Sequence, residues 1–225
     1  MKSYLSFSVK ELKAQKLMSA LILIAVMLSC MMTTALGGSL GILQTLRIRQ
    51  AASLNGDRYA TFHQLTEEQM RQLETDPRLS SVGSMVTVGH TELGSSGLTL
   101  FAREYLGNAL DAYPGNGIIL EGRLPASPLE IALPENALQY IEGEIQIGDT
   151  VSLQMEISRM DGSLPAYEFT ADYLITGILK SNYITLTSGT LDAVLGCGSA
   201  SALLPEDYLL YSTDFKTEDL ADFQS

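Results

Sequence analysis

Gly37, Ser39 and Gly41 reproduce the G-x-S-x-G pattern that surrounds the nucleophilic serine of many hydrolases. That serine requires a strand before it and a helix after it. Here the pattern lies inside a long apolar run, so it does not predict a nucleophile. The same residues also form Gly37-x-x-x-Gly41, a spacing that allows a second membrane helix to approach closely. We interpret Gly37 and Gly41 as candidate helix-packing residues, with simple tolerance of small side chains as the alternative.

The other residues that could do chemistry are few and scattered. His63 and His90 are the only histidines, and the sequence has neither H-E-x-x-H nor C-x-x-C spacing, so each is interpreted as a half-exposed strand residue. No phosphate-binding, dinucleotide-binding or Ca²⁺-binding loop pattern occurs. The sequence therefore predicts no catalytic residue, no cofactor and no metal site, and the chain should not hydrolyse ATP by itself. An anchored hydrolase would lack a nucleophile and a base.

One uncharged segment dominates the chain. Leu17 to Leu46 contains thirty residues without a charged side chain. As a helix it would reach about 45 Å, against about 30 Å of hydrocarbon in a bilayer. A cleaved signal peptide is the alternative, but signal cores run about 7 to 15 residues. We therefore predict a retained transmembrane helix over residues 17–46.

Charge predicts the orientation of this helix. Residues 1–16 carry four Lys and one Glu and read as a basic amphipathic segment, with a disordered basic tail as the alternative. Residues 50–225 carry 25 acidic and 8 basic side chains. Because cytoplasmic flanks collect Lys and Arg, the N-terminus is expected inside and the residues after about 47 outside the cell. The acidity also excludes nucleic acid as a partner. Cys30 lies in the span and Cys197 in the acidic part, so they are not expected to pair.

The remaining chain mixes strand and helix patterns. Residues 47–56 should extend the helix as a stalk, and Thr66 to Gln69 form a capping box that predicts a helix over 66–75. A further short helix is expected at 134–141. Alternating or β-rich stretches bounded by turns predict strands at 57–65, 79–91, 98–103, 118–120, 151–157, 167–179 and 208–212.

These elements lack a regular βαβ repeat, which indicates the α+β class. We expect a mixed α/β extracytoplasmic domain over residues 57–213, built of two small subdomains. Residues 214–225, with helical character at 217–223, would begin a return helix toward a second membrane span.

Four short blocks in the middle of the chain occur in a particular order. They are Gly122-Arg123-Leu124-Pro125, Glu130-Ile131-Ala132-Leu133, Ile147-Gly148-Asp149-Thr150-Val151 with Leu153, and Ile175-Thr176-Gly177-Ile178. Their order and spacing, behind a basic start and a first membrane helix, resemble FtsX/MacB-type ABC transporter permeases with a MacB-like core domain. The glycines fit turns or close strand approaches, and Asp149 can bond its own backbone, so the blocks look structural.

The resemblance implies a bacterial permease subunit in the cell membrane. It implies a cytoplasmic ABC ATPase and a second or paired permease as partners, with membrane lipid around the helices, for export or mechanotransmission. Such permeases are expected to have four membrane helices, so the chain resembles an N-terminal portion or a truncated product. The alternative is a complete single-pass anchored binding or sensor domain.

Overall fold

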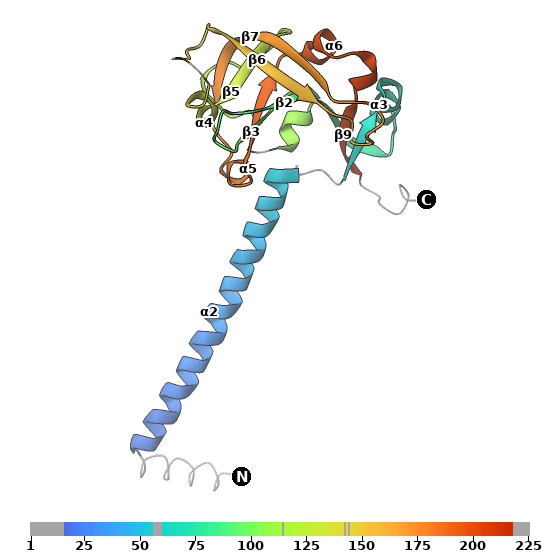
Figure 1. Cartoon of the computed structure of the whole chain (residues 1–225). Helices are drawn as coiled ribbons and strands as arrows, with labels where there is room; N and C mark the ends of the chain where they lie inside the picture. The colour runs from blue at the N-terminus through green and yellow to red at the C-terminus, as the bar shows by residue number, and fades with distance from the viewer. Residues whose placement is uncertain (1–15, 56–59, 114, 142, 144, 218–225) are drawn as a thin grey trace. The chain divides into compact units, whose positions relative to one another are not determined.

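The computed structural model describes residues 16–55, 60–113, 115–141, 143 and 145–217. The chain divides into two compact units, Met1–Arg49 and Gln50–Ser225, which are treated separately below. The first unit contributes most of one long helix, and the second is a sheet-rich domain (Figure 1). The predicted basic segment 1–16 lies, except for Lys16, outside the described residues, as does the helix expected at 217–223 beyond Thr217.

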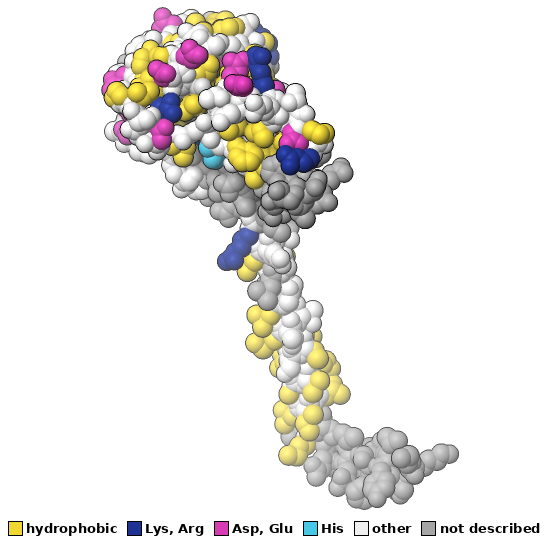
Figure 2. Space-filling model, turned by 90° about the vertical axis from the view of Figure 1, so that its right-hand side faces the viewer, with side chains coloured by type: hydrophobic (Ala, Val, Ile, Leu, Met, Phe, Trp, Pro, Cys, Tyr) yellow, Lys and Arg dark blue, Asp and Glu magenta, His cyan; other side chains and the backbone are white. Residues whose placement is uncertain are grey.

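Helix α2 runs without interruption over Lys16–Asn55. It includes both the predicted span and the stalk up to the residue before Gly56. Within it, Ala20–Arg47 has a mean hydropathy of 2.2 over its most apolar window and none of that window is buried. By length and composition this is the one helix in the described part of the chain that could cross a membrane. Figure 2 shows the hydrophobic side chains along it.

Several hydroxyl groups of α2 are satisfied within the helix. Four of them donate to the carbonyl oxygen one turn earlier, at 2.5 to 2.9 Å: Thr33 to Ser29, Thr34 to Cys30, Ser39 to Ala35 and Thr45 to Gly41. Hydrocarbon offers no hydrogen-bond partners, so an unsatisfied polar group there costs several kcal/mol. These four residues are thus compatible with an apolar surrounding.

The domain contains nine strands, six short helical elements and connecting turns in its described residues. They follow the order β1 Ala60–Leu65, α3 Glu67–Glu74, β2 Leu79–Glu92, β3 Thr99–Gly107, η1 Ala109–Ala112, β4 Ile119–Gly122, β5 Glu130–Pro134, α4 Glu135–Leu138, β6 Thr150–Ile157, β7 Tyr167–Leu179, α5 Tyr183–Thr187, β8 Thr190–Leu195, α6 Ser199–Leu203, η2 Glu206–Tyr208 and β9 Tyr211–Thr217. The predicted capping box of α3 is confirmed, because Thr66 accepts from the Gln69 amide while Gln69 bonds the Thr66 backbone.

Six of the strands close into a ring. The hydrogen-bonded neighbours run β2, β3, β8, β5, β7 and β6, and β6 returns to β2 at the bridge between His90 and Glu156. β9 and β1 extend the sheet from the other part of the β2 edge, and β4 pairs with the end of β7. β6 and β7 form the predicted antiparallel hairpin, from Thr150 opposite Leu174 to Ile157 opposite Tyr167.

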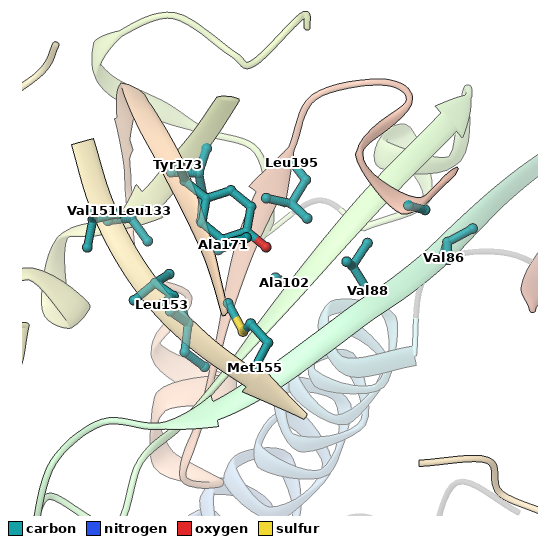
Figure 3. Close-up of a cluster of buried hydrophobic side chains, with 14 of the residues drawn as sticks. Val86, Val88, Ala102, Leu133, Val151, Leu153, Met155, Ala171, Tyr173 and Leu195 are labelled. Atoms are coloured by element: carbon teal, nitrogen blue, oxygen red, sulfur yellow. The ribbon is translucent and has the colours of Figure 1, made fainter. Parts of the chain in front are cut away.

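Alternate side chains of the ring fill its interior. Figure 3 shows Val86 and Val88 of β2, Ala102 of β3, Leu133 of β5, Val151, Leu153 and Met155 of β6, Ala171 and Tyr173 of β7 and Leu195 of β8 facing one another. The fully buried Tyr173 hydroxyl has no hydrogen-bond partner among the residues that the structure describes, and burial raises its pKa to about 12. Period-two alternation, clear in β6 and in much of β7, therefore helps to build the main apolar core of the domain.

Closure of the ring depends on a small residue at the β2–β6 crossing. The pairing of β2 with β3 shifts between Thr87 and Gly89. A Cβ at Gly89 would lie 3.0 Å from the Met155 Cβ and 3.3 Å from the Glu156 carbonyl oxygen. Glycine at this bulge lets the two backbones approach closely.

The structure corrects several boundaries. Residues 50–225 form one compact unit in which one sheet joins all nine described strands, and the division into two small subdomains stays a prediction. Residues 214–217 belong to β9 and do not begin a return helix: the buried Asp214 accepts bonds from Thr61 and Tyr113, and Phe215 stacks on Phe62 at 5.2 Å. The helix expected at 134–141 is only four residues long, and β5 and β8 were not predicted as strands.

Candidate functional site

The four sequence blocks meet at one end of β7. Gly122 lies opposite Gly177 in the β4–β7 ladder. A Cβ at Gly122 would collide with the Thr176 carbonyl oxygen, and one at Gly177 with the Arg123 carbonyl oxygen. Gly122 also has a φ of +79°, a conformation that L side chains rarely adopt. The expectation that these glycines permit close strand approach is confirmed.

An ion pair fixes the loop between β4 and β5. Arg123 donates from both terminal nitrogens to Glu130, at 2.8 and 2.7 Å, and the backbone amides of Ala126 and Ser127 also bond that carboxylate. The hydrogen bonds from Arg123 and then from the Ala126 amide lower the pKa of Glu130 from 4.5 to about 2. The first and second blocks are therefore joined through one carboxylate.

The third block joins the same end through its backbone. Gly148, at a φ of +97°, donates its amide to Ile175, and Ile175 donates to the Asp149 carbonyl at 2.9 Å. The Asp149 carboxylate accepts from the Gln146 amide at 2.8 Å, the local turn bond that the sequence predicted. We call this set of contacts the motif end of the hairpin.

A groove of about 320 Å³ opens at the other end of the β6–β7 hairpin. It lies where the β2 edge changes partner, between the last β9 pairing at Met85 and the β6 bridge at His90. Its walls come from five parts of the chain: Gln64, Thr87, His90, Phe101, Ile157, Ser158, Arg159, Met160, Tyr208, Leu210 and Ser212. Figure 2 shows hydrophobic and charged side chains intermixed on one face of the domain.

The loop that follows β6 is fastened across this groove to η2. Arg159 donates to the Asp207 carbonyl oxygen at 2.7 Å and also pairs with Asp161 at 2.9 Å. The Tyr208 hydroxyl donates to the Pro165 carbonyl oxygen at 2.7 Å, and its ring lies 5.3 Å from that of Tyr167. We call residues 158–166 the strap, since these contacts hold them to an element about 48 residues away.

Gln64 supports the strap from β1. It has a φ of +59°, unusual for a residue other than glycine, at the shift in the β1–β9 register. With its amide oxygen turned toward the strap, it accepts from the backbone amides of Met160 and Asp161 at 3.0 and 3.3 Å. Strained backbone of this kind concentrates at ligand sites and clamps.

A second hollow of about 310 Å³ shares His90 with the groove. It is acidic, because Glu92, Glu156 and Glu168 line it and the last two lie directly opposite each other in the ladder. Among the described residues no group of three or more His, Cys, Asp or Glu could hold a metal ion.

The two histidines lie on β1 and β2, which β9 separates in the sheet. His90 is half-buried, with its ring 5.6 Å from Phe101, and His63 is exposed, with Nδ1 3.0 Å from the Ser212 hydroxyl. The contact between His63 and Ser212 joins the adjacent antiparallel strands β1 and β9. No carboxylate contact to His63 is seen among the described residues. The arrangement is that of a cross-strand polar pair.

Gly37 and Gly41 lie one turn apart on α2, and a Cβ at either would meet nothing within 4 Å. Their role in packing against another membrane helix stays a prediction. Both thiols are free and exposed, Cys30 on the helix and Cys197 in the turn between β8 and α6.

The groove was not predicted from the sequence. The turn at Asp161 and Gly162 was expected, but nothing in the pattern signals that Arg159 and Tyr208 lie together. The unusual backbone of Gln64 likewise has no sequence signature. Motif spacing found the residues of the motif end and missed those of the groove.

No protein-family model and no curated protein sequence matches this chain. Two solved structures similar to it are the extracellular domain of the noncanonic ABC-type transporter YknZ from Gram-positive bacteria and the periplasmic region of MacB from Actinobacillus actinomycetemcomitans. The first has 9% identity and a TM-score of 0.46, covering 73% of this chain and 87% of that chain. The second has 14% identity and a TM-score of 0.43, covering 72% and 70%. The first of these structures is an extracellular domain and the second a periplasmic region.

Proposed function

We propose that this chain is the first membrane helix and the outer domain of an FtsX/MacB-type ABC transporter permease subunit. The observation that carries the proposal is the convergence of the four ordered blocks on one end of β7, where each block supplies a contact that its residue types require. The four blocks are far apart in the chain, and their contacts at this end of β7 give a structural reason for their residue types and order.

The topology of the domain supports the same role. β1 follows α2 after four intervening residues, and β9 is its antiparallel partner, with Ala60 opposite Phe215. The chain thus enters and leaves the domain on adjacent strands. Within the domain, β1 pairs with β9 and β9 pairs with the ring strand β2, so a force on β1 would reach the ring through β9.

In this proposal a separate cytoplasmic ATPase hydrolyses ATP, and the permease transmits the resulting motion to the outer domain for export or mechanotransmission. A second or paired permease would face α2 across Gly37 and Gly41, within membrane lipid. The N-terminus would be cytoplasmic, as the excess of lysine before the span favours.

Cysteine labelling in intact cells tests the topology. Cys197 is exposed in the domain and Cys30 lies within the span, so a Cys30→Ser variant leaves one reporter thiol. A membrane-impermeant maleimide should label Cys197 in intact cells, and a Cys30→Ser/Cys197→Ser variant should remain unlabelled. Labelling only after lysis would reverse the orientation. Recovery of an ATPase with the full-length gene product from membranes tests the transporter assignment.

A single-pass anchored binding or sensor domain is the second candidate, and the strapped groove favours it. The two candidates differ in their dependence on ATP. A permease should co-purify with an ATPase whose activity changes when α2 is altered at Gly41. An anchored binding domain should be recovered without one.

A further inference from the structure

We propose that His90 is an acid-sensitive clasp of the ring, whose protonation holds β6 more tightly against β2. Such a clasp goes beyond the proposed function, because it acts within the domain whatever ATPase or membrane topology the chain has. Its basis is the position of His90 in the sheet together with the charges that surround it.

His90 lies at the point where β6 closes the ring onto β2. β6 pairs with β7 from Thr150 to Ile157, whereas its described pairing with β2 is the bridge between His90 and Glu156. Residues directly opposite each other in antiparallel strands project to the same face, with Cβ atoms about 4.5 to 5.5 Å apart. A change of charge at His90 therefore acts directly on the closure of the ring.

Carboxylates lie near this bridge on three strands. Glu156 of β6 is opposite His90, and Glu168 of β7 is opposite Glu156. Glu92 follows His90 by two residues on β2. All four side chains line the hollow of about 310 Å³, and no Lys or Arg is among its lining residues. Because like charges directly opposite in a ladder are unfavourable, the glutamates of β6 and β7 repel each other while the imidazole is neutral.

Two arginines beside this hollow belong to ion pairs. Phe101, opposite the histidine on β3, has its ring 5.6 Å from the imidazole, and the Arg103 guanidinium lies 5.2 Å from that ring. Arg103 is paired with Asp192 of β8 at 2.9 Å. Arg159, in the adjoining groove, is paired with Asp161 at 2.9 Å. Each guanidinium has its own carboxylate, so neither compensates the three glutamates of the hollow.

The sign of the pH effect follows from this arrangement. Histidine side chains change charge between about pH 5 and 8. A protonated His90 places a cation opposite Glu156, so the closed ring favours the charged imidazole more than the unfolded chain does. By linkage, this stabilisation is present at mildly acidic pH and is lost as the pH rises. His63, which is exposed beside Ser212, provides an internal control.

Urea unfolding of the detergent-solubilised full chain at pH 8.0 and pH 6.0, followed by tyrosine circular dichroism, tests the clasp. On going from pH 8.0 to pH 6.0, the equilibrium constant for unfolding of the parent at a fixed urea concentration should fall by about threefold or more. His90→Gln should abolish this change, and His63→Gln should keep it. In the parent, amide protection over residues 88–92, corrected for the intrinsic effect of pH on exchange, should also be greater at pH 6.0.

Two glutamate variants locate the charge that His90 requires. Glu156→Gln removes the carboxylate opposite His90 and keeps the histidine, so the pH dependence should fall by about half or more. Glu121 lies on β4 opposite Ile178, and Glu121→Gln should leave the dependence unchanged. Equal stability and protection of the parent at the two pH values, a dependence that survives in His90→Gln, or equal effects of the two glutamate variants would each overturn the proposal.

Discussion

The two ends of the β6–β7 hairpin are held in different ways. At the motif end, backbone bonds such as Gly148 to Ile175 and the close approach of Gly122 and Gly177 fix strands against each other, and one ion pair closes the loop. At the groove end, side chains such as Arg159 and Tyr208 reach across to carbonyl oxygens of a distant segment. Backbone ladders tolerate little change, while side-chain contacts can be broken one at a time. The motif end of the hairpin is therefore expected to be more rigid than the groove end.

The largest expected effect is that of Gly122→Ala at the motif end. The new Cβ would collide with Thr176 and sit at a positive φ, so the free energy of unfolding should fall by about 3 kcal/mol or more. Tyrosine circular dichroism of the detergent-solubilised chain during urea unfolding measures this, since α2 contains no tyrosine.

Gly94→Ala is the matched control. Gly94 has a φ of +56°, but a Cβ there would meet nothing within 4 Å, so only about 1 to 2 kcal/mol of backbone strain is expected. Equal losses in the two variants would mean that the close approach of β4 and β7 contributes nothing.

Gly89→Val should have an intermediate effect at the closure of the ring. Its side chain would press on Met155 and on the β6 backbone, at a cost of about 1 to 3 kcal/mol. The same unfolding measurement applies. A variant as stable as the parent would show that β6 can move away from β2 without loss, contrary to a closed ring.

Glu130→Gln should make the free energy of unfolding less dependent on pH in the acidic range. The pKa of Glu130 is lowered in the folded chain to about 2, so its contribution is present above the ordinary value of 4.5 and is lost as pH falls through about 2. The parent should lose stability over that interval and the variant should lose less. Identical pH profiles would show that the Arg123 pair does not contribute.

The smallest stability effect is expected from Tyr208→Phe at the groove end. It removes the bond to Pro165 and keeps the ring against Tyr167, at about 1 kcal/mol or less. Amide exchange of the strap should nevertheless increase, because one of its few fastenings is gone. Unchanged exchange there would show that the bond does not hold the strap.

The sequence predicted the residues of the motif end but not those of the groove, and the difference has physical reasons. The strand Tyr167–Leu179 and the α3 capping box have local patterns, and both were predicted with the observed residues. β5 and β8 are short and largely buried, so they lack the clear alternation of a half-exposed strand. The strap contacts join residues about 48 positions apart, and the burial of Asp214 in β9 depends on Tyr113 and Thr61 from other elements. No local pattern encodes such contacts.

Hydrogen exchange of the full chain, followed by mass spectrometry of peptides, tests the difference between the two ends most directly. Amides bonded to backbone at the motif end, including Gly148 and Ile175, should exchange slowly, near the rate of the core strands. Amides of Met160 and Asp161, which donate to the Gln64 side chain when its amide oxygen faces the strap, should exchange many-fold faster. Equal protection at both ends, or faster exchange at the motif end, would contradict the account.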